Sequence, residues 1–300
     1  MTTPLDAPGI RVGAEHLIAL RRVALSADAD APLAALPGGF VTRRRGHGQD
    51  VADMREYVAG DDIRHLDRGT TARTGTLHVR RFQEERDRVT LLIADFRPAM
   101  LWGTRRALRS VAAAEILAMI GWRVVEEGGR VGLLALGAGA PVLVPLRGRT
   151  RGMLEVIGGL VRAHEAALQL ALAGETGMPP LDAGLSRTDR IAPRGAEVVI
   201  ASGFDEIGAG FRDRMDALSR NRAVRLVAVE DRAARRLPKG NYPIRMPGGA
   251  RRMARVAGAE YEDERRETIV GRVVLTLDAG AAPDLTARRI AAAFPPDREP

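Results

Sequence analysis

The fold of this chain is decided by residues 88–100, which read RVTLLIADFRPAM. A run of strand-forming residues from Val89 to Ala94 ends on an acidic residue, Asp95. A loop and a long apolar helix, predicted at residues 104–127, come next. Many α/β proteins place a site where a buried strand gives way to such a loop, because the carboxyl ends of parallel strands meet at one edge of the sheet. We therefore expect a site near Asp95.

Apolar strands and long helices alternate along the chain from Arg88 onward. Most of the predicted strands are continuous apolar runs, whereas the predicted helices have apolar residues at helical spacing. This alternation predicts a mostly parallel sheet covered by helices on both faces. The predicted strands are residues 76–82, 88–95, 131–137, 141–146, 197–202, 223–230 and 252–256, and the predicted helices are residues 14–25, 104–127, 150–172, 207–220, 260–275 and 285–294.

The composition is that of a globular protein without cysteine chemistry. The chain has 300 residues, of which 45% are hydrophobic and 28% charged, so it can bury a sizeable core. The absence of cysteine excludes disulfides, thiol catalysis and cysteine-ligated metal centres. The first residues do not have the basic and apolar stretches of a secretory signal, and no uncharged apolar run is long enough to span a bilayer. We therefore expect a cytoplasmic protein with no membrane segment of its own.

The net charge of +8 comes from arginine. Of the 46 basic residues only Lys239 is a lysine, which leaves 45 arginines. They are spread from end to end of the chain, and aromatic residues make up only 4% of it. A nucleic-acid-binding protein usually concentrates its positive charge and combines it with stacking aromatic side chains. We expect no nucleic-acid partner, with an arginine-rich nucleic-acid-binding protein as the alternative.

Residues 46–73 carry glycines and charges in a pattern that resembles a family hallmark. They read GHGQDVADMREYVAGDDIRHLDRGTTAR, which resembles the signature of the DUF58 family. Residues 79–85 (VRRFQEE) and 227–244 (VAVEDRAARRLPKGNYPI) resemble two further segments of that family, and the resemblance covers about residues 14–275. The predicted parts of the chain are an N-terminal helix and linker at residues 1–39, a charged and partly β signature segment at residues 40–88, and an α/β domain at residues 89–300.

The resemblance implies both a fold and a way of acting. It implies a doubly wound, mostly parallel sheet of von Willebrand factor A-like (VWA-like, Rossmann-like) type, with a metal-ion-dependent adhesion site (MIDAS) at the carboxyl ends of the strands. It also implies a non-enzymatic interaction or adaptor protein. The implied partners are a MoxR-type AAA+ ATPase and the client proteins that the pair assembles or remodels. We expect no cofactor.

The implied metal site is degenerate in this sequence. Such a site takes Asp-x-Ser-x-Ser on its first loop, a threonine on its second and an aspartate on its third, and these hard oxygen ligands suit Mg²⁺. Asp95 is present, but Arg97 and Ala99 replace the two serines and Gly203 replaces the third-loop acid, while the second loop reads MPPL at residues 178–181. We hypothesise that the site binds no metal and that Arg97 supplies positive charge by pairing with Asp95. The alternative is that Arg97 points to solvent and Asp95 only caps the strand end.

The signature segment holds a compact set of opposite charges that has three interpretations. These are an internal ion-pair network, a docking surface for a partner protein, and a hydrolase that uses Asp61 and Asp62 as an acid–base pair. Gly60 permits a tight turn before these two aspartates, either of which can cap a short helical turn. No nucleophile elbow, phosphate-binding loop or metal-ligand spacing of histidines occurs, so we expect no enzyme. The candidate binding residues are Arg55, Tyr57, Gly60, Asp61, Asp62, Arg64, Asp67 and Arg73.

Overall fold

The computed structural model of the chain forms two units. The first comprises residues 1–40 and 88–300, and the second comprises residues 41–87. The N-terminal helix therefore belongs to the same unit as the α/β part of the chain. The structure describes residues 7–27, 50–58, 66–83, 88–245, 251–256, 258 and 268–294.

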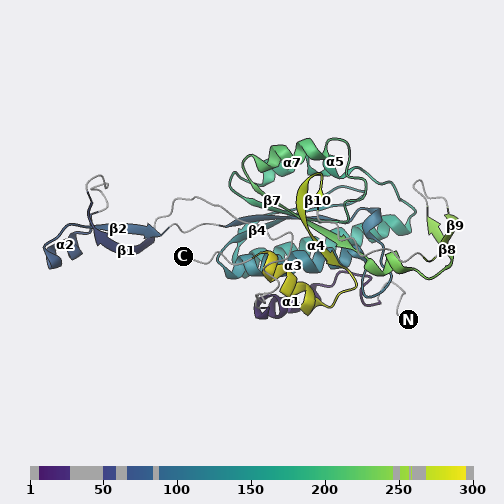
Figure 1. Cartoon of the computed structure of the whole chain (residues 1–300), viewed down its shortest axis with the longest axis horizontal. Coiled ribbons are helices and arrows are strands. Elements are labelled where there is room, and N and C mark those ends of the chain that lie inside the picture. The colour runs from purple at the N-terminus through teal and green to yellow at the C-terminus, as the bar shows by residue number, and fades with distance from the viewer. Residues whose placement is uncertain are drawn as a thin grey trace. The chain divides into compact units, whose positions relative to one another are not determined.

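A seven-stranded sheet forms the centre of the first unit (Figure 1). The strand order is β10-β11-β7-β6-β3-β4-β5. The five inner strands run parallel, and the outer strands β10 and β5 are antiparallel to their neighbours. The expected mostly parallel α/β sheet is therefore confirmed. The strands are β3 (Val89–Asp95), β4 (Arg130–Leu136), β5 (Val142–Gly148), β6 (Glu197–Ser202), β7 (Ala223–Glu230), β10 (Thr268–Ile269) and β11 (Arg272–Asp278).

Helices lie on both faces of this sheet, with α1, α3 and α4 on one face and α5 and α7 on the other (Figure 1). In β3, Leu92 and Ala94 join the core on the first face, whereas Leu91 and Ile93 join the core on the second. Successive strand residues point to opposite faces, so burial of both faces explains why β3 is a continuous apolar run. The helices are α1 (Ala14–Ser26), α3 (Arg109–Glu126), α4 (Arg149–Leu172), α5 (Leu181–Leu185), α6 (Thr188–Ile191), α7 (Phe211–Ser219) and α8 (Pro283–Ala293), with 3-10 turns η3 (Pro98–Met100) and η4 (Arg232–Arg236).

Polar contacts fasten α1 to α3. The indole nitrogen of Trp122 donates a hydrogen bond to the carbonyl oxygen of Leu17 at 3.0 Å. Glu115 of α3 is buried, and its carboxylate accepts two hydrogen bonds from Arg106, at 3.0 and 2.7 Å, and lies 2.8 Å from Nε2 of His16. A buried carboxylate needs such partners because desolvation penalises its charge.

The C-terminal part of the chain corrects one predicted element. The helix predicted over residues 260–275 is wrong over residues 268–275, where the chain forms β10 and β11; residues 259–267 lie outside the described residues. The segment is rich in β-branched residues, which favour strands. β11 pairs with β7 in the central sheet, and the side chains of Val274 and Leu275 are buried there.

Two small antiparallel sheets of two strands each complete the described chain. In the second unit, β1 (Asp50–Glu56) pairs with β2 (His78–Gln83), and α2 (Arg68–Thr74) lies in the connection between them. The strand expected at residues 76–82 is confirmed as β2. In the first unit, β8 (Gly240–Arg245) pairs with β9 (Arg251–Val256), which confirms the strand expected near residue 252.

A histidine is buried between α3 and α4. His164 is 1% exposed, and its Nε2 lies 2.9 Å from the hydroxyl oxygen of Ser110. The ring of Phe96 meets the imidazole edge to face, with 5.3 Å between the ring centroids. Burial, which disfavours the charged imidazolium, lowers the pKa of His164 from 6.5 to about 4.

We expect this histidine to make the stability of the protein pH-dependent below neutrality. The unfolded chain takes up a proton on His164 near pH 6.5 and the folded chain only near pH 4, so stability is lost as the pH falls between these values. From about pH 7.5 to about pH 5, the wild type should lose about 2 kcal/mol more unfolding free energy than the variant His164→Gln. Urea denaturation of both proteins at both pH values measures the difference, and equal losses would contradict the assignment.

Candidate functional site

The candidate site lies at the carboxyl ends of the central strands β3 and β6. Asp95 is the last residue of β3, and Ser202 is the last residue of β6, which pairs with β3 in parallel. Arg97 follows Asp95 by two residues, just before the turn η3. Asp95 and Arg97 are each only 1% exposed, so this arginine is among the largest fully buried side chains of the described chain.

Arg97 and Asp95 form a bidentate ion pair. Nε of Arg97 donates to Oδ1 of Asp95 at 2.9 Å, and Nη2 donates to Oδ2 at 2.8 Å. The backbone N–H of Arg97 also donates to Oδ1 at 3.0 Å, and the Ser202 hydroxyl donates to Oδ2 at 2.6 Å. Paired forks of this kind are among the stronger charge-assisted hydrogen bonds. The predicted Arg97–Asp95 pair is therefore confirmed, and the alternative in which Arg97 points to solvent is wrong.

The remaining guanidinium hydrogens bind backbone carbonyls of two other loops. Nη1 donates to the carbonyl oxygens of Pro179, at 2.7 Å, and of Glu206, at 3.0 Å. Nη2 donates to the carbonyl oxygen of Asp205 at 2.8 Å. A guanidinium has five N–H donors, and all five are engaged here. Arg97 thus ties together the loop after β3, the segment before α5 and the loop after β6.

The loop after β6 has an unusual backbone that suits this role. Phe204 and Glu206 have φ angles of 54° and 44°, in the left-handed region that residues other than glycine rarely adopt. The N–H of Phe204 donates to the hydroxyl oxygen of Ser202 at 2.8 Å, which helps to hold the turn. The resulting turn presents two successive carbonyl oxygens to Arg97. Strain of this kind persists only where surrounding contacts over-determine the conformation.

A second arginine, Arg109 at the start of α3, closes the site from the side of β7. Its Nη2 donates to Oδ2 of Asp205 at 2.7 Å, and its Nε donates to the carbonyl oxygen of Val229 at 2.9 Å. A Cβ atom added at Gly203 would lie 1.3 Å from Nη2 of Arg109. The guanidinium of Arg109 thus fills the space that a side chain at position 203 would need.

The residues at this position do not fit a divalent cation. Both carboxylate oxygens of Asp95 already accept hydrogen bonds from Arg97, and Ala99 and Gly203 have no side-chain oxygen to offer. No group of three or more histidine or acidic side chains within the described ranges could hold a metal ion. The carboxylate of Asp95 is bound by a guanidinium, which supplies positive charge but no open coordination position.

Comparison with known proteins identifies the family. Residues 53–253, about two thirds of the chain, match the family described as protein of unknown function DUF58. The chain belongs to the DUF58 family. Uncharacterized proteins of Mycobacterium bovis and of two Mycobacterium tuberculosis strains are each 32% identical to it over 102 residues, or 34% of this chain. The match spans about a third (32%) of the length of these curated relatives.

A solved structure is similar to part of this DUF58 protein. The conserved hypothetical protein BatB from Bacteroides thetaiotaomicron aligns with 69% of this chain and 98% of its own, with 14% sequence identity and a TM-score of 0.42. Within the described residues, no helix is both long and apolar enough to cross a bilayer.

The DUF58 signature residues are only partly described. Gly60, Asp61, Asp62 and Arg64 lie outside the described residues, as does the predicted turn that Asp61 or Asp62 would cap. Arg55 lies in β1 opposite Val79. The backbone N–H of Tyr57 donates to the carbonyl oxygen of Leu77 at 2.8 Å.

Asp67 has a role that the sequence reasoning missed. Its Oδ1 accepts a hydrogen bond from the backbone N–H of Thr70 at 2.7 Å, so it caps the N-terminus of α2. Arg73 is exposed in the last turn of that helix, where a cation is favoured by the helix dipole. An aspartate directly before the first residue of a helix is a recognisable capping signal. Its structural role in the second unit is therefore shown, and a docking role for the signature stays a prediction.

Proposed function

We propose that this DUF58 protein is a non-enzymatic adaptor of von Willebrand factor A-like type that partners a MoxR-type AAA+ ATPase in the assembly or remodelling of client proteins. In this proposal its strand-end loops are held by an internal arginine in place of a metal ion. The observation that carries the proposal is the complete use of the Arg97 guanidinium by Asp95 and by the carbonyls of Pro179, Asp205 and Glu206.

This saturation argues against chemistry at the site. A catalytic carboxylate must exchange a proton or a ligand with substrate, and both oxygens of Asp95 are engaged and buried. A metal-dependent adhesion site needs a cation that can accept a carboxylate from a partner, and a saturated guanidinium has no position for one. The loops can still present their outer surface to another protein, in a conformation that is fixed without metal.

The abundant arginines give less support to nucleic-acid binding. Arg97 and Arg225 are themselves buried, the latter against the fully buried carboxylate of Glu197, and Arg106 binds Glu115. Guanidinium groups committed to buried carboxylates are not available to phosphates. The alternative hydrolase would depend on Asp61 and Asp62, which lie outside the described residues.

The proposal predicts a complex whose affinity does not change when divalent cations are chelated. We expect the purified protein to co-elute in size-exclusion chromatography with the MoxR-type ATPase of its own genome, in nucleotide-free buffer. Its dissociation constant, from calorimetry, should be the same with excess EDTA as with excess MgCl₂, because Arg97 needs no metal to hold the loops. Loss of the complex in EDTA and its return with Mg²⁺ would overturn the metal-free adaptor, and no complex in either buffer would overturn the ATPase partnership.

A further inference from the structure

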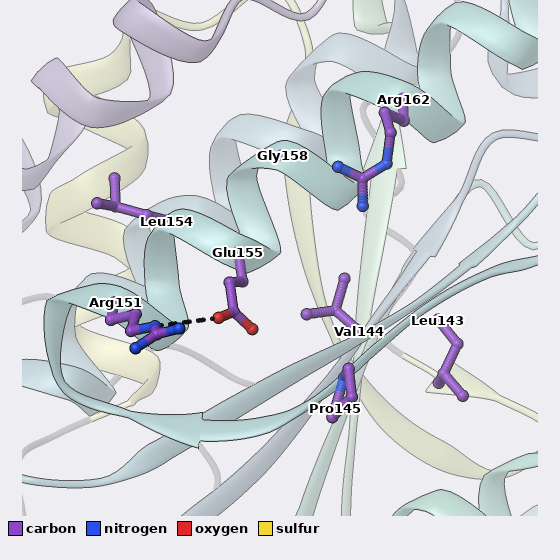
Figure 2. A pocket seen from close by; sticks show the side chains of 8 residues that line it. All are labelled: Leu143, Val144, Pro145, Arg151, Leu154, Glu155, Gly158 and Arg162. Atoms are coloured by element: carbon purple, nitrogen blue, oxygen red, sulfur yellow. Dashed lines mark ion pairs between the residues drawn. The ribbon is translucent and has the colours of Figure 1, made fainter.

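A groove of about 410 Å³ runs between the edge strand β5 and helix α4 (Figure 2), and its lining includes none of the residues that bind Arg97. Glu155 and Arg162 extend from α4 toward the strand, and Val144 points back toward the helix between them (Figure 2). Gly158 lies between these two α4 residues. The groove is lined by Leu143, Val144, Pro145, Arg151, Leu154, Glu155, Gly158 and Arg162.

The groove is positively charged. Arg151 is highly exposed, with 82% of its side chain accessible, and it shares the carboxylate of Glu155 with Arg147. The N···O distances are 3.5 Å from Arg151 and 3.0 Å from Arg147. Arg162 is exposed at the other end of the groove. Three guanidinium groups against one carboxylate leave two positive charges, so the groove complements an acidic ligand.

Exposed apolar side chains accompany this charge. Leu143 and Pro145 of β5 are exposed, the former by 52%, and Leu154 of α4 is 44% exposed. The lining contains no aromatic side chain on which a base could stack. A charged groove with aliphatic walls suits a peptide better than a single-stranded nucleic acid, because nucleic-acid grooves usually provide stacking platforms.

Gly158 is not required by the packing of the protein itself. A Cβ atom at Gly152 would lie 2.3 Å from the carbonyl oxygen of Arg147, and one at Gly159 would lie 2.6 Å from Cγ2 of Val144, so both must be glycine. At Gly158 the nearest atom is the flexible end of Arg162, at 3.3 Å. Glycine in a helix interior costs about 1 kcal/mol relative to alanine. An open notch at this point of the groove, kept at that cost, suits close approach by another molecule.

Sheet extension is disfavoured at this edge. Pro145 has no N–H to donate, and the β4–β5 register shifts between Val131 and Leu133. A proline and an irregular register are devices that blunt an edge strand against further pairing. A ligand in this groove is therefore held by its side chains.

We propose that this groove binds an acidic segment of a partner protein. A bulky apolar side chain of that segment packs against Gly158 between Glu155 and Arg162, and flanking carboxylates meet Arg151 and Arg162. The proposal goes beyond the adaptor function, because the groove is lined by none of the residues that bind Arg97.

Selection from a phage-displayed library of random linear peptides on the full-length protein tests this proposal. We expect the enriched peptides to combine acidic residues with a large apolar residue. Synthetic copies should bind Arg151→Glu/Arg162→Glu about tenfold or more weakly, and Gly158→Leu likewise. The matched control is Arg187→Glu/Arg190→Glu, which makes the same change in net charge at two exposed arginines elsewhere and should bind as the wild type does. Circular dichroism confirms that each variant is folded.

Three outcomes would overturn the proposal. One is that no peptide is enriched above the background, and the second is that the selected peptides bind the groove variants and the control alike. The third is that a single-stranded oligonucleotide binds more tightly than the peptides and loses binding in the same groove variants. None of these results bears on the ATPase complex, whose own test is the chelation experiment.

Discussion

Replacing Arg97 with methionine is expected to lower the unfolding free energy by about 3–5 kcal/mol. The substitution keeps an aliphatic stem but leaves Asp95, which is 1% exposed, as a buried carboxylate without its guanidinium. It also removes the donors that serve the carbonyls of Pro179, Asp205 and Glu206. Breaking a buried ion pair lowers the unfolding free energy far more than breaking an exposed pair does, because the charge that remains is desolvated. Urea denaturation followed by circular dichroism measures the loss.

Two companion variants make the measurement specific to the buried pair. Arg151→Met removes an arginine that is 82% exposed, and it should change the unfolding free energy by no more than about 0.5 kcal/mol. Asp95→Asn combined with Arg97→Met should be less destabilised than the sum of the two single variants, because residues in contact are coupled. If Arg97→Met behaved like Arg151→Met, the three loops would not depend on the guanidinium.

The buried strands could be predicted from the sequence because both faces of the central sheet are covered. EVVIAS and AVRLVAVE become β6 and β7 with the expected bounds, 197–202 and 223–230. The strand β11 was harder to predict, because the polar residues Arg272 and Thr276 interrupt its apolar run. The same residues can be arranged at helical spacing, and pairing with β7 decides the outcome.

Only the part of the candidate site that is formed by side chains close together in the sequence could be predicted. Asp95 and Arg97 are two residues apart, so opposite charge suggested their pairing. The other partners of Arg97 are backbone carbonyls more than 80 residues away, and backbone atoms carry no residue signature. The role of Arg109 could not be predicted from the sequence either. It is one of 45 arginines, and its position depends on the space left by Gly203.

These loops hold a guanidinium at their centre, and the guanidinium of Arg109 lies where a side chain at position 203 would be. The Ser202 hydroxyl donates to Asp95. The loops thus supply the groups that hold the guanidinium, whereas Ala99 and Gly203 offer no side-chain oxygen to a cation.

Replacing Arg97 and Ala99 with serine is expected to make stability depend on a divalent cation. In Arg97→Ser/Ala99→Ser, the carboxylate of Asp95, the Ser202 hydroxyl and the carbonyls that now face the guanidinium surround a space of cation-binding character, and two new hydroxyls join them. Such hard oxygen ligands suit Mg²⁺ and Mn²⁺. At a free ion concentration of about 100 times the dissociation constant, binding adds about 2.7 kcal/mol to the unfolding free energy. The wild type should show no response, because Arg97 fills the position.

Thermal denaturation with and without MnCl₂ measures this response. If the double variant is unfolded without the ion, its refolding on addition of MnCl₂ measures the response instead. Adding Asp95→Asn to the double variant is the matched control, since it removes the carboxylate that pairs with the guanidinium in the wild type. It should abolish the response to the ion and leave the two serines in place. A double variant that ignores both cations at saturating concentration would show that the loops close over the space, and that the guanidinium is a packing element with no relation to a cation position.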